Sequence, residues 1–444
     1  MSLVFGACFA DGRLIELRRS HKSNRSYMAA RTMSDILLNS SLYNRAETLG
    51  FSAPHSMNRF RRGSSMQQNL KDLLFVLFVL FGALPFTCNS GAQQRLCFSA
   101  EEHARAEKAA RVYRSPDRGY DPVIGYNPAR GPRIGSPLVN TEGVAQRINC
   151  VANTDETPGA GTTPKFFCAV PGVTDKDGKL IRLKIKPHFK GQSADKRNGE
   201  VYGEFLSSRF SKAMGFFADD EWVADVNCPD CKKSLTRDFQ GAEFSPFQPA
   251  AGVELSLASG IDANCDGKDS ASLAGELQTL LDNGAPRAEI DAFKLWLAFI
   301  DHGDTKADNH KLACLKTSTK GNTRACEPGE AVFYVSDMGS TFGYSTSSEK
   351  KARLEGWSKK DPIKVSGGSC TTNAKSVGDT KISEAGRELL ATNLQRLLDA
   401  EKHNHVITRV FAASRNGERD RPPAEWTAEF VRKARMIIDA RCSN

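Results

Sequence analysis

The sequence predicts an α+β protein in which a small β-rich part carrying one helix precedes a larger, mostly helical part, with disulfides stapling the fold. Alternating apolar and polar residues within 161–244 are typical of half-buried strands. Apolar residues recur every three or four positions through 288–444, which is typical of amphipathic helices. Ten of the twelve cysteines, all except Cys8 and Cys88, follow residue 92. An even number of cysteines favours disulfides if the chain is exported, which the N-terminal ninety residues predict.

Length and charge set the general class of protein. With 444 residues the chain can form one large domain or two of medium size, each with an ample core. The formal charge of +9 is spread along the chain, and no stripe of alternating aromatic and basic residues is present. We therefore expect no nucleic-acid partner.

The N-terminal ninety residues predict export. Residues 1–65 are rich in Arg, Ser and Asn without a sustained apolar period, so they are expected to be disordered or an artefactual extension. Residues 66–92 have the features of a signal peptide, with an apolar run at 73–84 that is short for a bilayer span of about 20 residues. Basic residues precede this run, and Ser90-Gly91-Ala92 follows it. We expect translation to start at Met57 or Met66 and cleavage after Ala92, giving a secreted or periplasmic protein with no membrane contact; an uncleaved anchor is the alternative.

Residues 93–160 are expected to hold one helix and a strap. The helix covers 99–114, with Ser99 as its cap and Glu102 in the capping-box position. The Pro- and Gly-rich stretch at 115–137 is typical of an extended segment over the surface.

Residues 161–244 predict strands and one amphipathic helix at 199–216. The expected strands are 166–170, 179–186 and 222–226, with an edge strand at 239–244 and a hairpin turn at 174–178. Residues 245–287 are expected to form an insertion loop. Its Asp262–Gly267 stretch resembles the start of a calcium loop, but Leu273 stands at the twelfth position, where such a loop needs a glutamate.

The cysteines leave two alternatives open. Cys314 and Cys326 flank a polar loop, so a bridge between them could staple it. Cys228 and Cys231 could be half of a zinc site, although no second CxxC is present to complete it. Connectivity cannot be deduced from sequence.

The most informative stretch is 299–343, where two apolar elements each end at an acidic residue. A helical pattern stops at Asp301-His302-Gly303, and the spacing H-x-D-x-K-x-x-N follows, with Asp304, Lys306 and Asn309. A strand-like run at 331–335 then ends at Asp337-Met338-Gly339. Phosphoryl transfer depends mainly on placed charge, so this set suits it. Asp304 would orient and deprotonate an acceptor hydroxyl, Asn309 and Asp337 would hold Mg²⁺, and Lys306 would neutralise charge on the transferred group.

A strand lysine and a helix glutamate upstream complete the pattern. Such a pair places nucleotide phosphates. Lys186 with Glu200 is the preferred pair; Lys184 lies on the same strand face and Glu204 one helical turn later, so either could substitute. No G-x-G-x-x-G loop precedes Lys186.

From about Phe166 onward the chain resembles the atypical branch of the protein-kinase-like fold. The relatives of this branch include HipA-type kinases, phosphoinositide kinases and secreted Fam20-type kinases. The resemblance rests on Lys186, on Glu200 with the following FLSSRFSKAMGF, on HGDTKADN and on DMGSTFG. The last motif is also similar to a DxGxTFG ending in uncharacterised bacterial exported proteins. The resemblance implies a two-lobed fold that binds ATP and a divalent metal, with Asp304 as the base, Asn309 and Asp337 on the metal, and Lys186 and Glu200 placing the phosphates.

Two functions follow as expectations. The first is an exported kinase-like phosphotransferase that uses ATP and Mg²⁺ or Mn²⁺ to phosphorylate a hydroxyl of a protein or glycan acceptor. The second is a catalytically inactive kinase-like binding module outside the cytoplasm. The spacing of Asp304, Asn309 and Asp337 favours the enzyme.

Overall fold

A computed structural model describes most of the chain beyond residue 97. The described residues are 9–10, 13–14, 98–131, 147–153, 164–174, 180–187, 198–235, 245–257, 259–261, 272–320, 323–343, 353–414 and 421–443. The chain divides into two units, Met1–Gln94 and Arg95–Asn444. In the first unit only a strand pair is described, β1 (Phe9–Ala10) and β2 (Arg13–Leu14). The predicted signal peptide, the edge strand at 239–244, the hairpin turn after Thr174 and the Asp262–Gly267 stretch lie outside the described residues. None of the helices in the described ranges is long and apolar enough to cross a bilayer.

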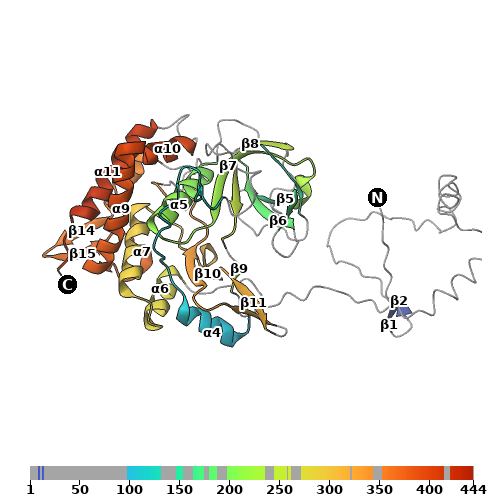
Figure 1. Cartoon of the computed structure of the whole chain (residues 1–444), viewed down its shortest axis with the longest axis horizontal. Coiled ribbons are helices and arrows are strands. Elements are labelled where there is room, and N and C mark those ends of the chain that lie inside the picture. The colour runs from blue at the N-terminus through green and yellow to red at the C-terminus, as the bar shows by residue number, and fades with distance from the viewer. Residues whose placement is uncertain are drawn as a thin grey trace, which may run out of the picture. The chain divides into compact units, whose positions relative to one another are not determined.

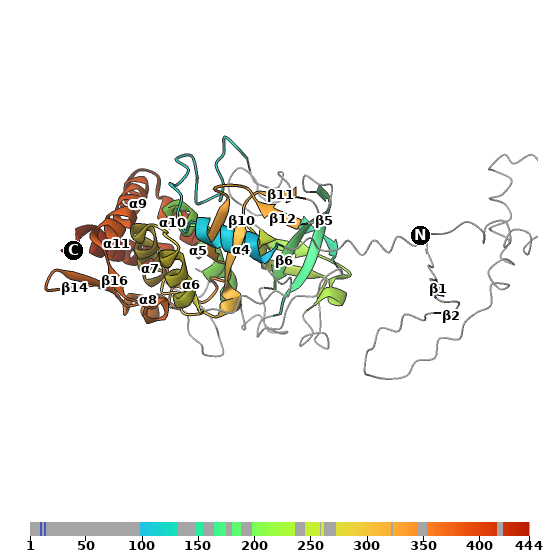
Figure 2. The same ribbon diagram turned by 90° about the horizontal axis from the view of Figure 1, so that it is seen from below.

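The second unit is α+β, as predicted, and contains a six-stranded mixed sheet (Figures 1 and 2). The strand order is β3-β7-β8-β6-β5-β4, in which β3 and β7 are parallel and the other pairs are antiparallel. The strands are β3 (Ile148–Asn149), β4 (Val151–Ala152), β5 (Phe166–Thr174), β6 (Leu180–Lys186), β7 (Asp220–Asn227) and β8 (Phe247–Leu255). Three of these confirm the strands predicted at 166–170, 179–186 and 222–226.

The expectation of an insertion loop over 245–287 is wrong for two of its segments. Strand β8 lies in the middle of the sheet between β6 and β7. Apolar and polar residues hardly alternate along β8. A central strand is covered on both faces, so the residues on both faces are mostly apolar. A helix, α6 (Leu273–Asp282), follows, capped by Ser272 and buried through Leu277 and Leu280.

One face of the sheet packs on the helix α5 (Glu200–Met214), and the other forms a separate apolar core. Almost every residue of α5 is buried, and it ends at Gly215, whose φ of 90° suits a glycine. Val201 of α5 lies over Gly252 of β8, where an added Cβ would approach it to 3.1 Å. The opposite core contains Phe166, Leu183 and other strand residues, together with the short helix η1 (Cys231–Ser234).

The C-terminal half is mainly helical. Its helices are α7 (Arg287–Phe299), α8 (Leu354–Ser358), α9 (Glu384–Asn404), α10 (Val406–Ala413) and α11 (Pro423–Asp439), with short turns η3 (Ala307–Asn309) and η4 (Lys375–Val377). They enclose the largest core, in which the rings of Phe299, Trp357 and Phe430 contact one another. The helical periodicity predicted within 288–444 runs on from α9 into α10, but the helix itself is interrupted there, because His405 takes a left-handed φ of 51° and ends α9.

Three small sheets complete the unit. They are β13-β10-β9, β11-β12 and β14-β15-β16. Their strands are β9 (Ser259–Gly260), β10 (His310–Cys314), β11 (Thr317–Lys320), β12 (Thr323–Cys326), β13 (Ala331–Val335), β14 (Ile363–Ser366), β15 (Ser369–Thr372) and β16 (Lys381–Ile382).

The helix expected at 99–114 is shorter than predicted. Helix α4 covers Ala100–Ala109, and the Ser99 hydroxyl accepts the Glu102 N–H as the capping pattern predicts. It stops because Arg111 exchanges backbone hydrogen bonds with Ala331 and Phe333 and so takes an extended conformation. The strap then continues through 114–131.

Four cysteine pairs of the described residues lie at disulfide distance. Cys314–Cys326 is the staple that the sequence allowed, and Cys228 and Cys231 lie within disulfide distance of each other. The remaining pairs are Cys150–Cys168 and Cys370–Cys442. The Sγ atoms of Cys150, Cys228 and Cys231 also lie within 4.8 Å of one another, so these cysteines in the reduced state keep the zinc alternative open.

Candidate functional site

The helix α7 and the strand β10 hold a loop that carries the predicted acidic motif. The chain leaves α7 through Asp301, whose left-handed φ of 54° turns the backbone sharply. The loop then runs to His310, where β10 starts. Because β10 pairs antiparallel with β13 and His310 lies opposite Val335, Asn309 comes to lie beside the residues that follow β13.

Backbone hydrogen bonds hold the two motifs against each other. The N–H groups of Ser336 and Asp337 both donate to the Asn309 carbonyl, at 2.8 and 3.3 Å. Gly303 N–H donates to the Ser340 carbonyl at 3.0 Å. The segment with Asp304 and the segment with Asp337 are therefore joined by backbone hydrogen bonds near both ends of the loop.

Lys186, at the end of β6, lies between two carboxylates. It forms an ion pair with Glu204 of α5, and its Nζ is 3.6 Å from Asp337 Oδ1. Only 3% of the Lys186 side chain is exposed. Burial alone would lower the Lys186 pKa, but the Asp337 and Glu204 carboxylates outweigh it and raise that pKa well above its usual value.

The preferred pairing of Lys186 with Glu200 requires a correction. Glu204, the alternative one helical turn later, is the residue in the ion pair. Glu200 instead packs on Gly339, where an added Cβ would lie 3.0 Å from the Glu200 Cβ. The error has a simple cause: the helical period places both glutamates on one face, and only the depth of docking decides which one meets the lysine.

Small residues determine how closely α5 approaches the Asp337–Thr341 segment. A Cβ on Gly203 of α5 would lie 2.5 Å from the Gly339 carbonyl oxygen, so only glycine allows this approach. The Thr341 hydroxyl donates to the Met338 carbonyl at 2.9 Å and lies 2.8 Å from the Ser207 hydroxyl on α5. Helix α5 is thus locked onto the Asp337–Thr341 segment.

Asp337 is an ionised and partly open carboxylate. Lys186 is the main reason that the Asp337 pKa lies far below its usual value, and the desolvation that opposes this shift is smaller. Its side chain keeps 41% of its exposure. Such a group is available to a cation that approaches from outside.

The other motif residues also have defined partners. The Asn309 side-chain amide N–H donates to the Asp304 carbonyl at 3.1 Å, which leaves the Asn309 amide oxygen as an acceptor. Lys306 forms an ion pair with Asp304 at 2.8 Å and is largely exposed. The hydrogen bond that the Lys306 ammonium donates to the Asp304 carboxylate is the main reason for the raised pKa of Lys306.

His302 occupies the floor of the loop. Its ring is buried, and neither ring nitrogen has a hydrogen-bond partner among the described residues. Burial lowers the His302 pKa to about 4, although the nearby Asp337 and Asp304 carboxylates act in the opposite direction. The ring is therefore neutral at physiological pH.

A row of charged side chains crosses the sheet next to Lys186, and it was not predicted from the sequence. Lys184 lies opposite Glu254 of β8, which lies opposite Glu221 of β7, and Lys184 and Glu254 form an ion pair. Carboxylate oxygens of Glu221, Glu254 and Glu204 lie within 4.8 Å of one another. Burial is the largest cause of the strongly raised pKa of Glu221, and the two neighbouring glutamates add to it. Single acidic residues inside apolar strands were the available signal.

The sequence was compared with protein-family models and with curated proteins. No protein-family model matches the sequence. A search of curated proteins also finds no significant match. The arrangement of the site residues is therefore the basis for assigning a function.

Proposed function

We propose that this chain is an exported kinase-like phosphotransferase with a two-lobed, protein-kinase-like fold. The order of elements supports the fold, because α5 connects β6 to β7 beside a mainly antiparallel sheet, and the helices α6 to α11 follow the last strand of that sheet (Figure 1). The six-stranded sheet with α5 would be the small lobe. The part from α7 onward would be the large one.

The observation that carries the proposal is the position of Lys186 between Glu204 and Asp337. A buried lysine paired to a helix glutamate is the device by which kinases hold the α- and β-phosphates, and the neighbouring Asp-x-Gly aspartate holds the metal. The three residues come from β6, α5 and the segment after β13, which are far apart in sequence. A scaffold with no ligand gains little from such a buried ionic group, since desolvation offsets its attraction.

The donor set suits a hard divalent cation and a polyphosphate. Asp337 is ionised and partly exposed, and Asn309, whose backbone carbonyl accepts the Asp337 N–H, carries a neutral side-chain oxygen acceptor. Mg²⁺ or Mn²⁺ prefers such oxygen ligands and completes its shell with water and phosphate oxygens. Asp337 and Asn309 would hold the metal, and Lys186 would bind the phosphates of ATP. The bound metal would supply charge neutralisation on the transferred group.

Asp304 would accept the proton of the acceptor hydroxyl, and Lys306 beside it would offset negative charge. In support, the two side chains form an ion pair at 2.8 Å and keep 72% (Lys306) and 29% (Asp304) of their exposure. The acceptor would be a hydroxyl of a protein or a glycan. Export is supported by the paired cysteines, because disulfides persist in oxidising compartments.

Calorimetric titration of the purified chain with ATP in the presence of Mg²⁺ or Mn²⁺ tests the proposal. We expect saturable binding that Asp337→Ala weakens by at least about tenfold, since a charged metal ligand is lost. Asp308→Ala is the matched control, because Asp308 is an exposed carboxylate in the same loop. Absence of binding in the unchanged chain with both metals would favour the inactive binding module.

Asp304→Ala separates catalysis from nucleotide binding. Asp304 is assigned to the acceptor and not to the phosphates, so turnover should fall by about 10²–10⁴-fold while ATP affinity changes little. The readouts are phosphate transfer, or ATP hydrolysis if no acceptor is at hand, and the same titration. A large loss of ATP affinity would show that the role of Asp304 is wrong.

A further inference from the structure

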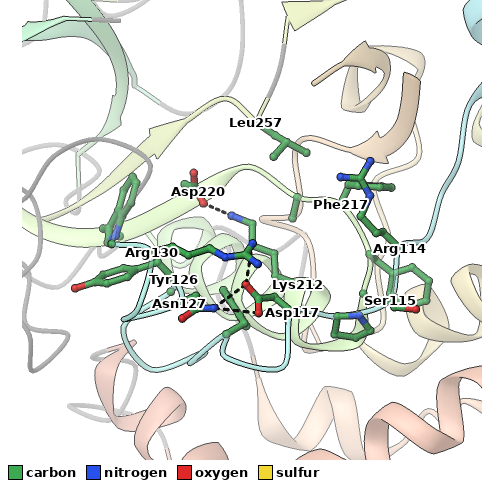
Figure 3. Close-up of a pocket in the computed structure, with 18 residues that line it drawn as sticks. Arg114, Ser115, Asp117, Tyr126, Asn127, Arg130, Lys212, Phe217, Asp220 and Leu257 are labelled. Carbon is green, nitrogen blue, oxygen red and sulfur yellow. Dashed lines mark hydrogen bonds and ion pairs between the residues drawn. The ribbon is translucent and has the colours of Figure 1, made fainter. Parts of the chain in front are cut away.

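The strap over 114–131 covers a cavity at the C-terminal end of α5, which is the end opposite Glu200. The strap crosses the C-terminal turn of α5 and the start of β7, and a cavity of about 450 Å³ lies between them (Figure 3). Pockets for small organic molecules span about 300–1,000 Å³. None of the residues assigned to phosphoryl transfer lines this cavity.

The cavity is held open by specific contacts. Arg114 N–H donates to the Gly215 carbonyl at 2.9 Å, which fixes the strap to the end of α5. Further along, Gly125 lies directly on the Arg209 guanidinium, and an added Cβ would be only 0.8 Å from Arg209 Nη1. That guanidinium in turn donates to the Glu221 carbonyl of β7 at 2.8 Å. The pocket is therefore preformed.

The walls are mostly apolar and aromatic. Tyr126 comes from the strap, and Phe216, Phe217 and Leu257 close the other side. Two further lining groups, Tyr120 Oη and Trp222 Nε1, are buried donors for which the described part of the chain supplies no acceptor. Unsatisfied buried donors are costly, so a ligand that brings oxygen atoms would gain their hydrogen bonds.

Two arginines give the pocket an anion-binding character. The side chains of Arg114 and Arg130 are 54% and 77% exposed, and their ion pairs, with Glu330 at 3.8 Å and Asp117 at 3.4 Å, are long. Figure 3 shows the Arg130 guanidinium beside Asp117 and Arg114 beside the Phe217 ring. A guanidinium presents paired donors that match a carboxylate. Lys212, by contrast, is already committed to Asp220.

We propose that this pocket binds a small aromatic carboxylate. The ring would pack on the aromatic wall, and the carboxylate would take up hydrogen bonds from Arg114 and Arg130. This assignment is independent of the phosphotransferase proposal, because it uses other residues and a binding readout alone.

Calorimetric titration of the full chain with 2-naphthoate tests the pocket. We expect one-to-one binding, and we expect the neutral 2-naphthamide, which has nearly the same shape, to bind at least about tenfold more weakly, because charge-assisted hydrogen bonds are lost. Failure of 2-naphthoate to bind, or equal binding of both compounds, would overturn the proposal.

Variants locate the site. Arg114→Gln and Arg130→Gln should each weaken 2-naphthoate binding about tenfold. Arg118→Gln, an exposed strap arginine outside the lining, should not.

Trp222 is the one tryptophan of the four that lines the pocket, the others being Trp296, Trp357 and Trp426 in the helical core. Binding should therefore quench fluorescence in the unchanged chain but not in Trp222→Phe. Quenching that persists in Trp222→Phe, or unchanged affinity in both arginine variants, would place the ligand elsewhere.

Discussion

The two faces of the six-stranded sheet differ in what they bury, and consecutive residues of β6 show the contrast. Ile185 points to the face where it lies opposite Phe166 and Val253, in an apolar core that also contains the Cys150–Cys168 and Cys228–Cys231 pairs. Lys184 and Lys186 point to the face under α5 and meet carboxylates there. Apolar burial stabilises a fold, whereas buried ions are costly to desolvate and are common at functional sites. We infer that the apolar face maintains the sheet and that the charged face serves function.

Removing the central cation should have the largest effect. Lys186→Met leaves the buried Glu204 carboxylate without its partner, so the free energy of unfolding should fall by about 3–5 kcal/mol. ATP binding should be lost as well. Urea denaturation gives the first quantity and calorimetry the second; a stability change under about 1 kcal/mol would contradict the contrast between the faces.

Adding Glu204→Leu to Lys186→Met sharpens that result. Replacing both members of a buried ion pair by apolar groups is often neutral or stabilising, so stability should recover to near that of the unchanged chain. ATP binding should stay absent. A double variant as unstable as the single one would mean that the pair is needed for folding rather than for function.

Acid should destabilise the charged side through His302. The His302 pKa falls from 6.5 to about 4 on folding, so the neutral ring contributes stability that is fully present above pH 6.5. That contribution is lost as pH falls from 6.5 towards 4, by about 3 kcal/mol in total. His302→Phe should remove this part of the pH dependence in denaturation measured at pH 7 and pH 4.5. His403→Gln, at an exposed position on α9, should leave it intact.

The unfolding free energy that is lost when a disulfide on the apolar face is removed should increase with the length of the loop that the disulfide closes. Cys228→Ala with Cys231→Ala opens a loop of only three residues in sequence separation and should cost about 1.5 kcal/mol. Opening Cys150–Cys168, with a separation of 18, should cost about 3 kcal/mol. Neither change should alter ATP affinity, because no predicted nucleotide contact comes from this face. Loss of ATP binding in the Cys228/Cys231 variant would show that the faces are coupled.

The sequence allowed the local elements of the site to be predicted, because those depend on period and spacing. The strand ending at Lys186, the helix ending near Asp301 and the strand before Asp337 all come from apolar patterns that tertiary packing did not override. The Asp304 and Asp337 motifs lie against each other because the strand that follows the first motif, β10, pairs with the strand that precedes the second, β13.

What could not be predicted depends on packing between segments distant in sequence. The choice of Glu204 over Glu200 rests on the close approach of Gly203 to Gly339, which no local pattern encodes. Strand β8 was missed because an apolar run without alternation has no distinct period. The break at His405 was missed because both sides continue the same helical stripe.

The smallest expected effect compares neighbours on one strand. Ile185→Val removes one methyl group from a fully buried position on the apolar face, so it should cost about 1 kcal/mol of unfolding free energy. Its side chain points away from Glu204 and Asp337, so ATP affinity, measured on the folded protein by calorimetry, should stay within about twofold of the unchanged chain. The adjacent Lys186→Met abolishes binding under the same conditions if the faces are distinct. If Ile185→Val also reduced ATP affinity severalfold, the position of Lys186 would depend on packing across the strand, and the two faces would have to be treated as one unit.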